Sequence, residues 1–176
     1  LLKALGYNGI SDSDTEVILA AYQQWGTTCV NKFVGMWAIA LLDVEKQELF
    51  LSRDRFGIKP LYYSSTKNKF AFASEIKALL TLDFVEPEAN MNAIFEYVCF
   101  GATADPSSNL FEQIRPLSPG HNLTLNLKTL SADISCYYNI EKNILAYRLP
   151  SDNVIQKTFE EHLDNINIDW TNTLLA

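Results

Sequence analysis

The segment from Gly35 to Leu80 constrains the fold of this chain more than any other stretch. It alternates apolar runs with short polar turns, and its densest cluster of charged and turn-forming residues is Arg53-Asp54-Arg55-Phe56-Gly57-Ile58-Lys59-Pro60. Apolar runs of about four to eight residues that are bounded by turn residues are typical of strands. A polar turn held between strands can form one wall of a site on a rigid sheet. The segment therefore predicts a sheet with a polar site near residues 53–60.

Local patterns assign helices and strands on both sides of this site. Ser13-Asp14-Thr15-Glu16 has the serine and glutamate of a capping box, and apolar residues then recur on one face, so a helix is predicted at 13–25. A shorter helix is expected at 92–98, and a loop at 102–108. Because every residue of 36–42 is apolar, that stretch is expected to be a strand covered on both faces. The other predicted strands are 48–53, 61–64 and 70–73, with a hairpin formed by 122–127 and 132–138.

The order of these elements predicts the fold class and the domain organisation. Apolar strands joined by short turns, with helices before and after, favour an α+β layered fold with an antiparallel sheet. The first five residues resemble the end of a helix that Gly6 closes, and a helix without a beginning suggests a chain truncated at its N-terminus. Beyond Asn139 the polarity rises, and a last helix is expected at 154–163. We therefore expect one domain at 1–139, and at 140–176 a linker and the start of a second domain.

Composition and charge exclude several classes of protein. With 176 residues, of which 48% are hydrophobic, the chain can bury a full core. A net charge of −7 with scattered basic residues argues against a nucleic-acid partner. No apolar run approaches the roughly 20 residues of a membrane-spanning helix, and the first residues lack the pattern of a signal peptide. A cytoplasmic protein without membrane association is expected.

The cysteines and histidines form neither a disulfide pattern nor a metal-binding pattern. Cys29, Cys99 and Cys136 are odd in number, far apart and without Cys-x-x-Cys spacing, so all three are expected to be buried thiols. His121 has no second histidine or cysteine at ligand spacing, which argues against a metal site.

Two groups of polar residues could bind a ligand, and each also has a purely structural explanation. Asp14 lies in the first turn of its predicted helix, where the free amides and the macrodipole stabilise a carboxylate by about 0.3 to 1 kcal/mol. The same carboxylate could bind a ligand's ammonium group at the edge of a pocket. Glu75 and Lys77 follow a strand and could simply begin a solvated helix.

The cluster at residues 53–60 allows the same two interpretations. Arg53, Asp54 and Arg55 could form a surface network of ion pairs at a strand end, which would contribute little to stability. Gly57 and Pro60 would then make the tight turn into the next strand. The sequence has no Gly-x-Ser-x-Gly elbow, no phosphate-binding Gly-x-x-x-x-Gly-Lys loop and no His-Glu-x-x-His motif. The residues alone therefore predict an α+β domain with a polar site near 53–60.

A family resemblance extends this prediction. The chain resembles the glutaminase domain of glutamine-hydrolysing asparagine synthetases, which are class II glutamine amidotransferases. The match covers about three quarters of the chain and includes Pro119-Gly120-His121. Four motifs carry it, in the family's order and spacing: Ser-Asp-Thr-Glu-Val at 13–17, Gly-Met-Trp-Ala-Ile-Ala-Leu-Leu-Asp at 35–43, Arg-Asp-Arg-Phe-Gly-Ile-Lys-Pro-Leu-Tyr-Tyr at 53–63 and Ala-Ser-Glu-Ile-Lys-Ala-Leu at 73–79. The resemblance implies the N-terminal nucleophile (Ntn) hydrolase fold, in which two antiparallel sheets lie between layers of helices in the order α/β/β/α, here incomplete at the N-terminus.

The resemblance also implies a mechanism whose reacting groups are not expected in this chain. In the family an N-terminal cysteine attacks the amide of glutamine, with its own α-amino group as base, and ammonia passes to a second domain where ATP activates aspartate. An Asn-Gly pair in a Tyr-Asn-Gly-Glu motif holds the oxyanion, upstream of the helix that ends here at Leu5. Tyr7-Asn8-Gly9 is interpreted as a turn instead, because Ile10 replaces the glutamate. No catalytic residue and no glutaminase activity are therefore expected in residues 1–176 alone.

The resemblance assigns one ligand-binding position and several supporting ones. Asp14 matches the family aspartate that holds the α-ammonium group of glutamine. Supporting roles in the pocket or at the domain contact are expected for Arg53, Asp54, Gly57, Pro60, Glu75 and Lys77. ATP and magnesium are expected only in a full-length enzyme, since the Ser-Gly-Gly-x-Asp-Ser loop that binds pyrophosphate is absent from this sequence. The expected partners are glutamine and a C-terminal synthetase domain, and a homodimer stays open.

Three functional hypotheses follow. The first is an incomplete glutaminase domain of an asparagine synthetase-like enzyme. The second is a non-catalytic module that kept the scaffold and binds a partner or an amino acid. The third is an amidotransferase that acts on another acceptor, such as a sugar or a peptide precursor.

Overall fold

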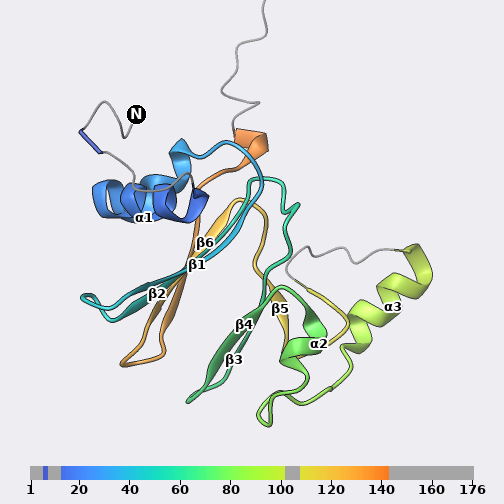
Figure 1. Ribbon diagram of the computed structural model, residues 1–176. Helices are drawn as coiled ribbons and strands as arrows, with labels where there is room; N and C mark the ends of the chain where they lie inside the picture. Colours follow the sequence, from blue (N-terminus) through green and yellow to red (C-terminus); the bar gives the residue numbers. More distant parts are fainter. Residues whose placement is uncertain (1–5, 8–12, 102–107, 143–176) are drawn as a thin grey trace, which may run out of the picture. The chain divides into compact units, whose positions relative to one another are not determined.

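The computed structural model describes residues 6–7, 13–101 and 108–142. Contacts divide the chain into two units, Leu1–Asn139 and Ile140–Ala176. Every element labelled in Figure 1 lies in the first unit. The predicted helix end at Leu5, the turn at Asn8, the loop at 102–107 and the helix at 154–163 lie outside the described residues.

The first element described in this unit is helix α1, Asp14–Trp25. Ser13 is its N-cap and accepts a hydrogen bond from the Thr15 amide at 3.3 Å, which satisfies one of the free amides of the first turn. The helix predicted at 13–25 is therefore confirmed. A short 3-10 helix that the sequence patterns did not predict, η2 at Gly26–Lys32, follows directly.

Two antiparallel sheets form the centre of the unit. The first has the order β1-β2-β6-β7, and the second has the order β4-β3-β5. Their bounds are β1 Ala38–Asp43, β2 Glu48–Arg53, β3 Tyr62–Ser65, β4 Phe70–Ala73, β5 Arg115–Pro116, β6 His121–Asn126 and β7 Ala132–Cys136. The strands predicted at 48–53 and 70–73 are confirmed to the residue, and the other predicted strands differ by one or two residues at one or both ends.

The two sheets pack against each other through a shared apolar cluster. Leu51 and Leu123 are opposite each other in β2 and β6, and both are fully buried. Tyr63 of β3 belongs to the same cluster, as do Leu61 and Leu117, which directly adjoin β3 and β5. Burying a large aliphatic side chain stabilises a fold by about 1.5 to 3 kcal/mol, so this cluster joins the sheets firmly.

Helices cover the outer faces of both sheets. Side chains alternate between the faces of a strand, so Phe50 points away from Leu51 and packs with Tyr22 of α1. On the second sheet, α2 at Ile76–Leu79 contributes Leu79 to a separate cluster with Val85 and Ile114. The layer order is helix, sheet, sheet, helix (Figure 1), which confirms the predicted α/β/β/α architecture.

Two predictions about burial are wrong. Strand β1 is an edge strand whose side chains alternate, with Leu41 buried and Leu42 57% exposed, so it is not covered on both faces. Leu41 packs in the cluster with α1, whereas Leu42 lies opposite Leu49, on the face that carries Leu51, and is left uncovered at this edge. Cys29 is buried, but Cys99 and Cys136 are exposed, since they lie on a helix surface and at the end of an edge strand.

Helix α3, Met91–Phe100, contains the predicted helix 92–98 and extends it at both ends. The Asn90 side chain caps it by accepting from the Ala93 amide at 3.0 Å. Met91, Phe95 and Val98 recur at helical spacing, and each is at least 66% exposed. The helix therefore presents an apolar stripe to solvent.

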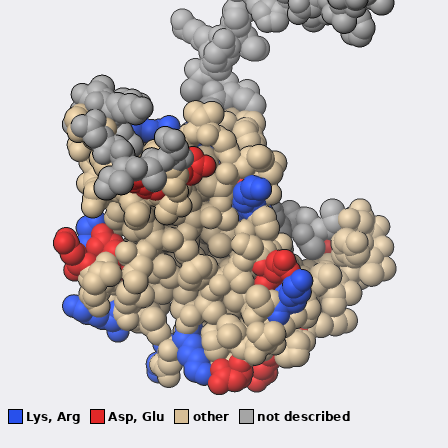
Figure 2. Space-filling model, viewed as in Figure 1, with Lys and Arg blue, Asp and Glu red and all other residues tan. Residues whose placement is uncertain are grey.

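Charged side chains lie mainly around the margin of the face shown in Figure 2, with a broad uncharged area between them. Acidic and basic groups are interspersed rather than gathered into a single stripe on this face. Of the helices in the described ranges, none has the length and hydropathy needed to cross a membrane.

Candidate functional site

The turn from Arg53 to Pro60, called the Arg53–Pro60 turn below, is organised by the buried carboxylate of Asp54. One oxygen, Oδ1, accepts hydrogen bonds from the amides of Phe56 at 3.1 Å and Ile58 at 3.0 Å. The other, Oδ2, accepts from the Lys59 amide at 2.9 Å. An aspartate that binds amides a few residues ahead is a standard way to hold a tight turn. Asp54 therefore fixes the backbone of the turn.

These bonds also set the charge state of Asp54. Burial raises the pKa of its carboxyl group, but the amides of Lys59, Ile58 and Phe56 stabilise the anion more strongly. The net result is a pKa below the usual value. Asp54 is thus a carboxylate at neutral pH, although its side chain is almost completely inaccessible.

The side chain of Arg53 also holds the turn, by binding backbone carbonyl groups. Its guanidinium donates to the carbonyl oxygens of Lys59 at 2.9 Å, Gly57 at 2.8 Å and Leu117 at 2.7 Å. Burial lowers the pKa of this guanidinium, and the three carbonyl groups replace part of its lost hydration. The last bond ties the turn to the segment that joins β5 to β6.

Gly57 and Pro60 occupy the positions that the sequence predicted for a tight turn. Gly57 has a φ of +65°, and a Cβ built there would lie 2.8 Å from Cγ of Pro119. Only glycine fits both the left-handed conformation and the close approach. Pro60 is exposed and directly precedes the buried Leu61.

Arg55 connects the turn to the segment after η2. Its guanidinium donates to the carbonyl oxygen of Phe33 at 2.6 Å and lies 5.6 Å from the ring centroid of Trp37. No described ion pair includes any of the three charged residues at 53–55. The interpretation as a surface network of ion pairs is therefore wrong, because these side chains bind the backbone instead.

Asp14 lies apart from the turn in the described hydrogen-bond network. It is the first residue of α1, it is exposed, and its carboxylate stands beside the free amides of the helix N-terminus. In the same first turn, Glu16 accepts a hydrogen bond from the Tyr7 hydroxyl at 2.9 Å. No described hydrogen bond joins Asp14 to the Arg53–Pro60 turn.

Glu75 and Lys77 form a surface ion pair at the start of α2. Their charged atoms are 2.6 Å apart, and 61% and 83% of the two side chains are exposed. Glu75 is the N-cap residue of α2, but its side chain makes no capping bond. A solvated pair of this kind contributes about 0 to 1 kcal/mol. The structure thus brings Arg53, Asp54, Gly57 and Pro60 together and leaves the other three predicted residues elsewhere.

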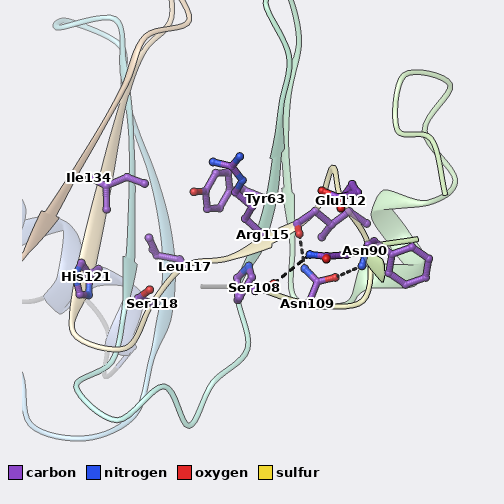
Figure 3. A pocket seen from close by; sticks show the side chains of 13 residues that line it. Tyr63, Asn90, Ser108, Asn109, Glu112, Arg115, Leu117, Ser118, His121 and Ile134 are labelled. Carbon is purple, nitrogen blue, oxygen red and sulfur yellow. Dashed lines mark hydrogen bonds between the residues drawn. The ribbon is translucent and has the colours of Figure 1, made fainter. Parts of the chain in front are cut away.

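A polar pocket that the sequence patterns did not predict lies between the two sheets (Figure 3). Its volume is about 510 Å³, and its wall includes Tyr63 and Arg115 from the second sheet and His121 and Ile134 from the first. Nδ1 of His121 lies 2.8 Å from the carbonyl oxygen of Pro119. These four residues are far apart in the sequence and share no single motif. Only the pairing of the strands and the packing of the two sheets bring them together.

Residues 1–138 match a family model described as a glutamine amidotransferase domain. The chain belongs to this glutamine amidotransferase family. The match spans most of the chain and includes both sheets, α1 and the Arg53–Pro60 turn.

Curated relatives carry more specific names. The chain is 34% identical over 140 residues to asparagine synthetase [glutamine-hydrolyzing] 3 of Bacillus subtilis, an alignment that covers 80% of the chain and 22% of the relative. It is 33% identical over 176 residues to asparagine synthetase [glutamine-hydrolyzing] 2 of the same organism, which covers 94% of the chain and 24% of the relative. The amidotransferase chain thus spans about a quarter of the length of these relatives.

A solved structure supports the fold. Glutamine phosphoribosylpyrophosphate amidotransferase from B. subtilis, complexed with ADP and GMP, superposes with a TM-score of 0.51 at 19% identity. The superposition covers 78% of this chain and 25% of that protein. At this identity the likeness concerns the fold alone, and it agrees with the predicted Ntn-type architecture.

The described part of this amidotransferase domain offers no group of three or more histidine, cysteine, aspartate or glutamate side chains that could hold a metal ion. Its buried carboxylate, Asp54, is fully engaged with backbone amides. The described residues therefore do not fit a magnesium site.

Proposed function

We propose that the chain is the glutaminase portion of a glutamine-dependent asparagine synthetase. In this proposal the full-length enzyme hydrolyses glutamine and uses the ammonia to amidate aspartate at the expense of ATP and magnesium. The observation that carries the proposal is the family match over residues 1–138, together with relatives named asparagine synthetase that are about four times as long. The segment at 140–176 would be a linker and the start of the synthetase domain.

Asp14 is proposed to bind the α-ammonium group of glutamine. Its exposure leaves the carboxylate accessible to a ligand, and its place in the first turn of α1 stabilises the negative charge. An exposed carboxylate can offer two oxygens to an ammonium group, which is a compact donor of three hydrogen bonds.

The Arg53–Pro60 turn is proposed to support the glutamine pocket and to contact the synthetase domain. Its backbone is held by Asp54 and Arg53, so it can keep a fixed shape at an interface. Phe56 and Ile58 on the turn and Met36 before β1 are each about 60% exposed. Large apolar side chains exposed together are typical of interaction surfaces. Glu75 and Lys77 are assigned a weaker supporting role at most, since they form a solvated pair.

The nucleophile is proposed to lie outside these 176 residues. Each of the three cysteines has its nitrogen in a peptide bond, so none has the free α-amino group that would act as the base. Burial also raises the pKa of the Cys29 thiol, which disfavours the thiolate. We therefore propose that residues 1–176 alone do not hydrolyse glutamine.

The proposal is tested with the full-length enzyme and glutamine labelled with ¹⁵N at its side-chain amide. With aspartate, ATP and magnesium, we expect ¹⁵N-labelled asparagine and formation of AMP and pyrophosphate. Glutamine hydrolysis without any asparagine would reject aspartate as the acceptor and favour another amidotransferase. Absence of hydrolysis with intact binding of glutamine would favour a non-catalytic module.

A further inference from the structure

Tyr137 follows the last strand of the unit and binds directly to the Arg53–Pro60 turn. Its hydroxyl donates to the carbonyl oxygen of Arg53 at 2.7 Å, across 84 residues of sequence. Its ring stacks on Trp37 with centroids 6.1 Å apart and an interplanar angle of 22°. Burial raises the pKa of this hydroxyl well above its usual range, so the group stays a neutral donor. Tyr137 thus fixes the residue at which β2 becomes the turn.

Tyr138 contacts two further residues of the turn. Its ring meets Phe56 edge to face, with centroids 5.9 Å apart and an interplanar angle of 72°. The guanidinium of Arg55 lies 5.6 Å from the centroid of the same ring. The two tyrosines therefore contact three residues of the turn, Arg53, Arg55 and Phe56.

Gly120 joins the tyrosines to the turn through the backbone. The amides of Tyr137 and Tyr138 both donate to the carbonyl oxygen of Gly120, at 2.9 and 3.2 Å. The Gly120 amide in turn donates to the carbonyl oxygen of Asp54 at 2.9 Å. Gly120 has a φ of +67°, and a Cβ there would collide with the Tyr138 carbonyl oxygen. The backbones of the turn, of Gly120 and of the two tyrosines are thus held close together.

The two tyrosines lie close to the boundary between the two units. The division between the two units follows Asn139, so Tyr138 is the second-to-last residue of the first unit. Arg55 and Phe56 contact the Tyr138 ring, so the turn lies in direct contact with the chain one residue before the end of the first unit.

We infer that Tyr137 and Tyr138 are positioning residues, which hold the Arg53–Pro60 turn in place and couple it to the chain that enters the second unit. They act through the turn and not on the substrate. The kinetic part of this inference rests on the proposed function, whereas the structural part does not. A displacement of about 1 Å in a supporting segment can reduce turnover by about 100-fold, so a modest loosening of the turn is measurable.

The first experiment measures hydrogen exchange in the 176-residue chain and needs no enzyme activity. Tyr137→Phe removes the hydroxyl but keeps the stacked ring, and Tyr97→Phe on the exposed surface of α3 is the matched control. We expect the turn amides of Ile58 and Lys59 to exchange about fivefold faster in Tyr137→Phe, as loss of one hydrogen bond implies. Unchanged exchange at the turn, or faster exchange throughout the unit, would overturn the inference.

The second experiment uses the full-length enzyme. In Tyr137→Phe and Tyr138→Leu we expect the KM for glutamine to rise about fivefold and less amide to be transferred per glutamine hydrolysed, with ammonia-dependent synthesis unchanged. An equal fall in glutamine-dependent and ammonia-dependent synthesis, or kinetics like those of Tyr97→Phe, would contradict the coupling. If the unaltered enzyme makes no use of glutamine, the proposed function fails, and hydrogen exchange still decides the positioning role.

Discussion

Replacing Asp54 by asparagine tests how the Arg53–Pro60 turn is held. The substitution keeps the shape of the side chain but turns one carboxylate oxygen into an amide NH₂ group. If the remaining oxygen keeps the amides of Phe56 and Ile58, the new NH₂ group faces the Lys59 amide, and two donors oppose each other. Hydrogen bonds to a charged group contribute about 1.5 to 3 kcal/mol each, so loss of one bond and of the charge on the others costs about 2 to 4 kcal/mol.

Urea unfolding of the 176-residue chain at pH 7 measures this loss. With a typical slope of about 2 kcal/mol per molar urea, the midpoint of Asp54→Asn should fall by about 1 to 2 M. Asp133→Asn, at an exposed position on edge strand β7, is the control and should change stability by less than about 0.5 kcal/mol. Equal midpoints for the two variants would refute the assignment of Asp54 as the organiser of the turn.

The pH dependence gives a second view of the same carboxylate. The pKa of Asp54 is lower in the folded chain than the value of about 3.9 for an unfolded aspartate. Its contribution to stability is therefore present above about pH 4 and is lost as the pH falls through the lower pKa of the folded state. The Asp54→Asn variant should therefore lack this part of the loss of stability at low pH.

Two further predictions concern the turn and the thiols. Gly57→Ala should destabilise the chain by about 2 to 4 kcal/mol in urea unfolding, because its methyl group meets a proline ring, whereas Gly101→Ala, with a similar φ but open space, should cost about 1 kcal/mol. Similar losses for both variants would show that the close approach at Gly57 is not tight. An aromatic disulfide reagent should titrate Cys99 and Cys136 in the native chain and Cys29 only after unfolding. Rapid labelling of three thiols under native conditions would contradict the buried position of Cys29.

Regular elements with strong local signals could be predicted from the sequence. The cap at Ser13 marked the start of α1, and turn residues separated β2, β3 and β4, so these boundaries were confirmed within a residue. Strand β5 carried no such signal, because it has two residues and one is Pro116, which lacks an amide hydrogen. Its place next to β3 depends on long-range packing.

The sequence predicted where the candidate site lies but not which groups its side chains contact. The sequence placed a polar cluster at residues 53–60, yet the partners of Arg53 and Arg55 are carbonyl oxygens that carry no sequence signal. The exposed face of β1 and the exposure of Cys136 were not predicted, because composition does not tell which strand lies at a sheet edge. The pocket in Figure 3 was missed for the same reason, since its wall forms only when the sheets pack.

The steady-state KM for glutamine of Asp14→Asn in the full-length enzyme tests the central claim most directly. Asparagine removes the charge at the proposed ammonium site and keeps the shape of the side chain, while Ser13 remains the N-cap of α1. We expect a rise of about 10- to 100-fold in the KM for glutamine, as loss of a charged hydrogen bond implies, with ammonia-dependent synthesis unchanged. An unchanged KM for glutamine, or an equal loss of both activities, would contradict it.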